Sequence, residues 1–185
     1  MSIFDPQFEI NPKPYVIQMT LAGIFMLFVF VAFNIYTQSA LIAAFSSSVF
    51  LAFTVPDSHS TDIRPMIGGY VVGMIIGAFF GIIYNSPLSG DFIGAFGNML
   101  GFTHIKAGTL SPGSPAYTAF FAFLAFITTA FSMAATDTEH PPAVGISVGL
   151  VINPWKPETL IFIMGGILAL TGFKKLFEKW MVDLI

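Results

Sequence analysis

The chain has 185 residues, of which 7 are Lys or Arg and 10 are Asp or Glu, so that only 9% are charged. A soluble domain carries about 25% charged residues, whereas 55% of this chain is hydrophobic and 22 residues are Phe. This composition excludes a soluble enzyme, a nucleic-acid-binding protein and a disordered chain. Because there is no Cys, disulfide bonds, thiolate nucleophiles and Cys-based metal sites are excluded as well.

The predicted fold is all-α, a polytopic transmembrane helix bundle in a single domain that covers residues 1–185. The first span is expected to be retained, because no base precedes Lys13 and no A-x-A cleavage site follows the apolar run 21–33. Residues 92–102 are apolar but too short to cross, so we expect an interfacial or re-entrant segment there. The six predicted spans, of which the second and fifth are short, are residues 14–36, 39–55, 66–84, 115–136, 141–152 and 157–173.

The distribution of Lys and Arg predicts the orientation, because cytoplasmic loops carry an excess of these residues. If the N-terminus is cytoplasmic, six spans leave only Lys106 and Lys156 outside. The five residues then inside are Lys13, Arg64, Lys174, Lys175 and Lys179. We therefore expect a multi-pass protein of the cell membrane with both termini in the cytoplasm.

Two parts of the chain align at an offset of 98 residues. Residues 44–56 and 142–154 are each rich in small side chains, end at a Pro and precede a Gly-Gly pair. We expect two repeat units, residues 14–84 and 115–175, related by inversion because each holds three spans. Many secondary transporters have such repeats, and their substrate sites lie where short segments of the two halves meet. Chance similarity between apolar segments is the alternative.

Glycine recurs at every fourth position of the third predicted span. This spacing places small residues on one helix face, where another backbone can approach closely. We interpret the stripe as a packing face, within one protomer or between protomers, and we expect a homo-oligomer. The four residues are Gly69, Gly73, Gly77 and Gly81.

The sequence His140-Pro141-Pro142 opens the fifth predicted span. Because Pro is favoured in a first helical turn, the helix is expected to begin here, with His140 at or before its N-terminus. Free N–H groups and the helix dipole make such an end an anion site, and the imidazole adds a donor. The alternative is a membrane-boundary turn in which His140 caps the helix and contacts lipid headgroups.

Three consecutive hydroxyls, Ser46, Ser47 and Ser48, lie within the second predicted span. In lipid they must face protein or water, and they can donate hydrogen bonds to an anion. Alternatively, they bond back to carbonyls of the preceding turn, which is the more frequent behaviour of helical Ser. Weaker candidates for lining a path, in the fourth span, are Thr128, Thr129 and Ser132.

The sequence contains no motif of a known catalytic class. There is no H-E-x-x-H sequence, P-loop or Ser-His-Asp order, so we expect neither an enzyme nor a cofactor. Asp57, His59 and Asp62 are neighbours in the sequence, but nothing completes a metal-ligand set around them, and we expect no metal.

Taken together, these motifs resemble the HPP family of integral membrane proteins. The sequence His140-Pro141-Pro142, followed by a small-residue helix, matches the motif that defines the family. Residues 45–48 stand where the family has Phe-Gly-Ala-Ser, and residues 56–69 cover its Pro-x-Ser and Arg-Asn-x-x-Gly-Gly segments. The resemblance runs from the first span to Phe173, which is nearly the whole chain.

Four residues depart from the family pattern: Ser46 and Ser47 replace Gly and Ala, Pro65 replaces Asn, and Tyr70 replaces a His. If that His acts on substrate in the family, its role is changed here. The resemblance implies a small multi-span protein, usually described with four helices, so six spans depart from the usual description. It also implies a link to nitrite, which some plant and cyanobacterial members carry across membranes.

The function predicted from the sequence is a transporter or channel for a small monovalent anion, nitrite being the best guess. Hydroxyl donors and few cationic residues favour a weakly held ion over phosphate or sulfate. The site is expected where the N-terminal ends of the second and fifth helices converge. The alternatives are a non-transporting membrane scaffold or sensor and, third, a membrane enzyme. The candidate substrate-binding residues are His140, Pro141, Pro142, Ser46, Ser47, Ser48 and Gly145.

Overall fold

In the computed structural model, the described part of the chain is helical and holds no strand. The structure describes residues 6–32, 39–99, 101 and 113–184. The long and medium helices are α2 (Lys13–Ala32), α3 (Ser39–Thr54), α4 (Ile63–Tyr84), α5 (Ser89–Met99), α6 (Pro115–Thr136), α7 (Pro141–Ile152) and α8 (Pro157–Phe177). Three short helices complete the described elements: α1 (Pro6–Ile10), η2 (His59–Thr61) and η3 (Glu178–Trp180).

Helix starts follow the proline positions. Helices α6, α7 and α8 each begin at a Pro, where the missing N–H group has no intrahelical partner to lose. Helix α4 begins at Ile63, three residues before its predicted start, because Pro65 is tolerated in the first turn. Helix α8 continues beyond its predicted end to Phe177. The positive charges of Lys174 and Lys175 in its last turn interact favourably with the negative end of the helix dipole.

Among the described residues, four helices are long and apolar enough to cross a membrane: Lys13–Val31, Ile63–Tyr84, Pro115–Thr136 and Pro157–Trp180. Helices α3 and α7 have 16 and 12 residues, which at 1.5 Å per residue gives about 24 and 18 Å. Both are shorter than a hydrocarbon core of about 30 Å. The chain is thus a helical membrane protein whose described residues hold four helices of spanning length, and full crossing by α3 and α7 stays a prediction.

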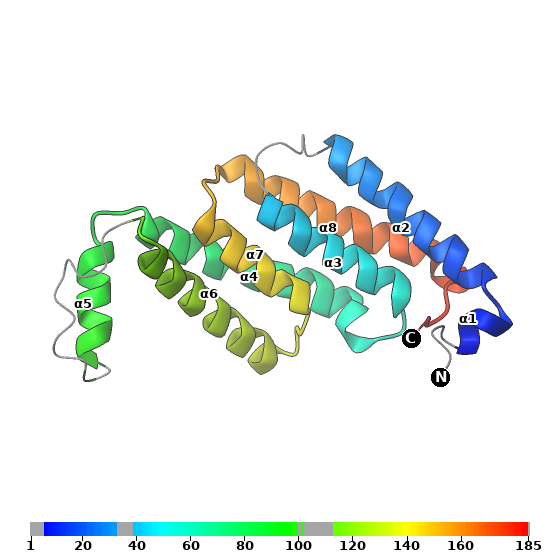
Figure 1. Ribbon diagram of the computed structural model, residues 1–185, viewed down its shortest axis with the longest axis horizontal. Coiled ribbons are helices and arrows are strands. Elements are labelled where there is room, and N and C mark those ends of the chain that lie inside the picture. Colours follow the sequence, from blue (N-terminus) through cyan, green and yellow to red (C-terminus); the bar gives the residue numbers. More distant parts are fainter. Residues whose placement is uncertain (1–5, 33–38, 100, 102–112, 185) are drawn as a thin grey trace.

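Helix α1 and the C-terminal end of the described chain lie at the same end of the bundle (Figure 1). The hydroxyl of Tyr15 donates to the carbonyl of Leu184 at 2.8 Å, and the side-chain amide of Gln18 donates to the carbonyl of Val182 at 2.9 Å. An even number of crossings puts both termini on one membrane face. Which face is cytoplasmic stays a prediction, and Lys106 lies outside the described residues.

The glycine stripe of α4 faces α7. A Cβ atom added to Gly73 would lie 2.5 Å from the carbonyl oxygen of Ala143, and one added to Gly77 would lie 2.6 Å from the Cα of Ser147. Both distances are below those of van der Waals contact, so a side chain at either position requires the two helices to separate. The stripe therefore packs two helices of one protomer together, and a homo-oligomer stays a prediction.

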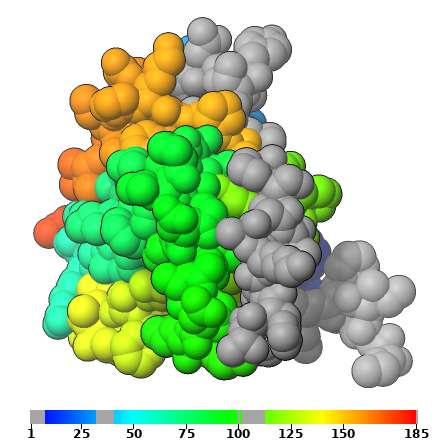
Figure 2. All heavy atoms as spheres, turned by 90° about the vertical axis from the view of Figure 1, so that its left-hand side faces the viewer, coloured from blue at the N-terminus to red at the C-terminus, as the bar shows by residue number. Residues whose placement is uncertain are grey.

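Helix α5 lies at the end of the molecule away from the termini (Figure 1), and Figure 2 shows it across this face. Aromatic contacts of Phe92 attach it to α4 and α6: the ring centroids of Phe92 and Phe80 are 6.3 Å apart, and those of Phe92 and Phe121 are 5.8 Å apart. The interfacial or re-entrant position predicted for residues 92–102 stays a prediction.

The order of long, short and long helices occurs twice, in α2–α3–α4 and again in α6–α7–α8. Helices α3 and α7 run antiparallel (Figure 1). The inverted repeat predicted from the sequence nevertheless stays a prediction, because element order alone does not establish a symmetry axis.

Candidate functional site

The centre of the site is a chain of hydrogen bonds between α3, α4 and the start of α7. The Oγ of Ser48 lies 2.8 Å from the Nε2 of His140 and 2.7 Å from the hydroxyl oxygen of Tyr70. On its other side, the Nδ1 of His140 lies 2.7 Å from the carbonyl oxygen of Ser60. All three side chains, Ser48, Tyr70 and His140, are fully buried.

When the imidazole is neutral, all the hydrogen bonds from Tyr70 to Ser60 are donated in one direction. A carbonyl oxygen only accepts, so the Nδ1 of His140 carries the hydrogen and donates to Ser60. The Nε2 atom then accepts from the hydroxyl of Ser48, whose oxygen in turn accepts from the hydroxyl of Tyr70. Every hydrogen in the chain has an acceptor, so the four groups form a satisfied polar network inside an apolar bundle.

Burial lowers the pKa of His140 to about 4, although the hydrogen bond to the carbonyl of Ser60 opposes this shift. The imidazole is therefore neutral near pH 7, in agreement with the direction of the hydrogen bonds. The residues alone did not fix the sign of the shift, because desolvation and neighbouring carboxylates act in opposite directions.

Gly69 allows the segment before α7 to close over α4. A Cβ atom on Gly69 would lie 2.9 Å from the Cβ of His140 and 2.9 Å from the carbonyl oxygen of Thr138. The next residue, Tyr70, places its ring 5.7 Å from the imidazole, measured between ring centroids. Glycine at position 69 thus brings His140 within reach of the hydroxyls on α3 and α4.

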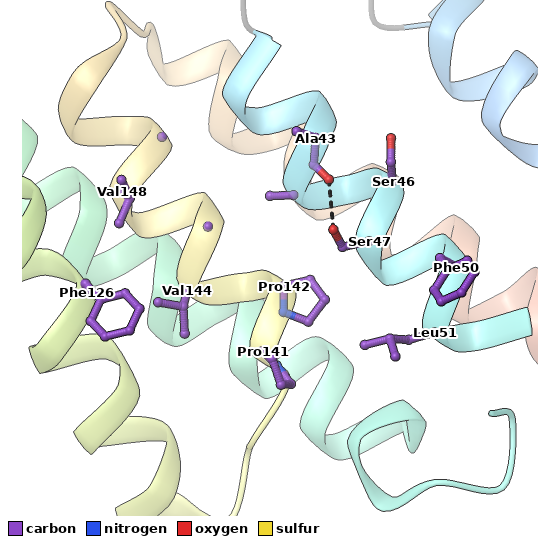
Figure 3. A pocket seen from close by; sticks show the side chains of 13 residues that line it. Ala43, Ser46, Ser47, Phe50, Leu51, Phe126, Pro141, Pro142, Val144 and Val148 are labelled. Carbon is purple, nitrogen blue, oxygen red and sulfur yellow. Dashed lines mark hydrogen bonds between the residues drawn. The ribbon is translucent and has the colours of Figure 1, made fainter. Parts of the chain in front are cut away.

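The three serines of α3 behave differently. The hydroxyl of Ser46 donates to the carbonyl of Ile42 at 2.8 Å, and that of Ser47 donates to the carbonyl of Ala43 at 3.1 Å (Figure 3). These two follow the back-bonding alternative, and only Ser48 is turned toward His140. Ser48 is also the one serine of the three that matches the family pattern.

An open, mostly apolar groove runs between α3, α6 and α7, beside the buried chain (Figure 3). Five of the seven candidate substrate-binding residues line it: Ser46, Ser47, Pro141, Pro142 and Gly145. Ser48 and His140 do not line it, and they are buried behind it. The predicted residues are thus divided between a groove and an enclosed polar chain.

Two features of the expected anion site differ in the structure. Positions 141 and 142 have no N–H group, and the N–H of Ala143 already donates to the carbonyl of His140 at 2.9 Å. The first turn of α7 therefore offers no free donor at its first three positions. In addition, the N-terminus of α7 meets Ser48 in the second half of α3, because the two helices are antiparallel and their N-termini do not converge.

Two residues of the site were not among the sequence candidates, Tyr70 and Ser60. The position of Tyr70 was visible as a departure from the family pattern, whereas a backbone carbonyl at residue 60 leaves no signal in a sequence. Thr129, by contrast, was predicted from the sequence as a weaker candidate for lining a path. Its hydroxyl is the one buried side-chain polar atom in the described part of the chain that has no hydrogen-bond partner.

A comparison with protein families identifies the chain's relatives. The family model described as "HPP, transmembrane region" matches residues 8–180. No curated protein and no solved structure matches the chain. The matched range covers all the helices from α2 to α8 and includes every residue of the buried hydrogen-bond chain.

Proposed function

The chain belongs to the HPP transmembrane family, and we propose that it transports a small monovalent anion, with nitrite as the favoured substrate. The observation that carries this proposal is the enclosed chain Tyr70–Ser48–His140 within an apolar bundle. Polar and ionisable groups inside a membrane protein are costly and mark substrate pathways by default. Some family members carry nitrite, as the resemblance implies.

The chemistry of the chain favours a singly charged ion. Tyr70 and Ser48 supply hydroxyl donors, and the imidazole of His140 is neutral. These three hydrogen-bonded side chains therefore carry no positive charge. Neutral donors hold a monovalent ion weakly, and conduction requires that the ion also leaves. A doubly charged phosphate or sulfate would need cationic partners.

Access requires a conformational change, because all three side chains are fully buried. Helices α3 and α7 meet closely here: a Cβ on Gly145 would lie 2.9 Å from the Cβ of Ala44. In this proposal, the described conformation is the closed one, and separation of α3 from α7 opens the groove toward Ser48. Transporters commonly sequester their site in this way.

A second function, a non-transporting scaffold or sensor, is favoured by one observation. Every hydrogen bond of the chain is satisfied within the protein, as expected of a network that fixes a fold. The two functions differ in what removal of one hydroxyl does. In a scaffold it lowers stability alone, whereas in a transporter it also lowers the flux of the folded protein.

Nitrite influx into liposomes that contain the purified protein tests the proposal. We expect Ser48→Ala and Tyr70→Phe to reduce the influx per folded molecule at least tenfold, and Ser47→Ala, a neighbouring serine bonded to its own helix, to leave it unchanged. Nitrite protonates in acid and then crosses lipid unaided, so protein-free liposomes at the same pH are the baseline. Wild-type influx equal to that baseline would refute transport of nitrite, and chloride and nitrate influx then test the anion class.

A further inference from the structure

A second cluster of side chains lies at the exposed end of the same region, on two segments about 80 residues apart. The Nε2 of His59 lies 3.3 Å from the Oδ1 of Asp137 and 3.8 Å from the Oε2 of Glu139. One ligand atom from each of these three side chains falls within 4.8 Å of the others. All three side chains are exposed, so they reach solvent directly.

The groups around the three side chains suit a cation. The Oδ2 of Asp62 lies 3.6 Å from the Nδ1 of His59, on the ring side opposite Asp137 and Glu139. A carboxylate on the second nitrogen orients a metal-bound His and increases its basicity. Arg64 contacts the Oδ2 of Asp137 at 3.2 Å, which leaves Oδ1 directed at His59. Three carboxylates against one guanidinium leave a net of two negative charges around the imidazole of His59.

We propose that His59, Asp137 and Glu139 bind a divalent transition-metal ion of the zinc class, with water as the remaining ligand. Bonds of about 2.0–2.2 Å in a tetrahedral site place two ligand atoms about 3.4 Å apart. The separations of His59 from its two partners, 3.3 and 3.8 Å, are close to this value. One imidazole with two carboxylates suits zinc and its neighbours, whereas Mg²⁺ and Ca²⁺ prefer oxygen ligands alone.

The metal would connect the two segments that hold the buried imidazole. His59 precedes Ser60, whose carbonyl accepts from the Nδ1 of His140, and Glu139 precedes His140 in the chain. Bound metal would therefore fasten the turn at residues 56–62 to the connection between α6 and α7. This inference goes beyond the transport proposal and does not depend on it.

The sequence did not predict this site, because Asp137 and Glu139 lie about 80 residues beyond His59 in the chain. Asp57, His59 and Asp62 do not form a complete set of metal ligands on their own. Asp62 lies near the Nδ1 of His59, on the side of the ring away from the proposed metal. Folding adds Asp137 and Glu139 to His59.

Titration calorimetry of the full-length protein in detergent, with any affinity tag removed and the protein treated with EDTA, tests the proposal. We expect Zn²⁺ to bind at one ion per chain, and we expect His59→Ala and Glu139→Gln each to weaken binding at least tenfold. Asp62→Asn should weaken it about tenfold. His104→Ala and Asp57→Asn are the matched controls and should leave it unchanged.

A second measurement keeps folding and binding apart. The melting temperature of each variant in EDTA should equal that of the wild type, because the altered side chains are exposed, and Zn²⁺ should raise it in the wild type and in the controls only. The Co²⁺-loaded protein should show the strong visible absorption of a four-coordinate ion. Absence of saturable Zn²⁺ binding, or binding that His59→Ala leaves intact, would overturn the site and identify the cluster as ion pairs alone.

Discussion

The hydroxyl of Ser48 and the Nε2 of His140 lie 2.8 Å apart, although 92 positions separate the two residues. This bond connects α3, in the first half of the chain, to the N-terminus of α7, in the second half. It also joins the one serine of its run that matches the family pattern to the histidine of the defining motif. The two motifs of the sequence that resemble the family pattern thus form one structural unit.

Replacement of Ser48 by Ala should destabilise the protein more than any other Ser-to-Ala change in α3. It leaves the Nε2 of His140 and the hydroxyl of Tyr70 without partners in a buried place, and each unsatisfied buried group costs about 1–3 kcal/mol. Ser47→Ala removes only a bond to its own helix and should stay within about 0.5 kcal/mol of wild type. Unfolding in detergent with increasing denaturant measures the difference, and equal midpoints would show that the buried chain contributes nothing to stability.

The Gly77→Ala substitution should disrupt the packing of α4 against α7. The new Cβ would lie 2.6 Å from the Cα of Ser147, a backbone atom that cannot move aside alone. Overpacking of this kind costs about 1–3 kcal/mol. Gly165→Ala is the control, since nothing lies within 4 Å of a Cβ there, and it should be neutral or slightly stabilising because Ala favours helix. Thermal unfolding of the two variants decides, and a Gly77→Ala melting temperature at the wild-type value would contradict this close contact.

The helices could be predicted well because proline and apolar length are local signals. Residues 115–136 and 141–152 were predicted with the bounds that α6 and α7 have in the structure, since a Pro marks each start. Membrane location and family followed from composition and from the residues of two motifs. The predicted short segments at α3 and α7 likewise correspond to the two shorter apolar helices found in the described residues.

The site could be predicted only in part, because its partners are set by packing between distant helices. Which of three adjacent serines points inward depends on the rotation of α3 against α7, and the sequence does not record that rotation. The acceptor for His140 is a backbone carbonyl, at Ser60, and any residue type supplies one. The donors expected at the start of α7 were absent for a reason that the sequence did contain, since two prolines have no N–H.

The topology prediction places both termini in the cytoplasm and position 106 outside. A single Cys introduced into this Cys-free chain labels only from the side it faces. Cys at position 106 should therefore react with an impermeant maleimide added outside intact cells, and Cys at position 13 should react only after the membrane is opened. Labelling of both positions from outside intact cells would exclude the three crossings that are predicted between them. The reverse pattern, with position 13 labelled from outside and position 106 only after opening, would invert the predicted orientation.

The titration of His140 should be unusual in both its midpoint and its tautomer. Burial lowers its pKa from 6.5 to about 4, and the bond to Ser60 requires the hydrogen on Nδ1. Tyr70 of α4 is the titratable side chain packed against the ring, and Asp137 and Glu139 precede His140 on its own segment. In ¹⁵N NMR spectra of histidine-labelled protein in EDTA, we expect one ring to stay neutral and Nδ1-protonated at pH 5.5. His140→Gln should remove its signals.

The same shift predicts how stability depends on pH. The pKa of His140 is lower in the folded state than the ordinary value of 6.5, so the unfolded chain binds this proton first as pH falls. The contribution to stability is fully present above about pH 6.5 and is lost progressively as the pH falls, and the loss reaches roughly 3 kcal/mol at pH 4. Other groups titrate in this range too, so the measurement is the difference between wild type and His140→Gln in unfolding free energy at pH 7.5 and 4.5. The glutamine variant should lose less stability than the wild type over this interval, and parallel losses would mean that His140 titrates alike in the folded and unfolded states.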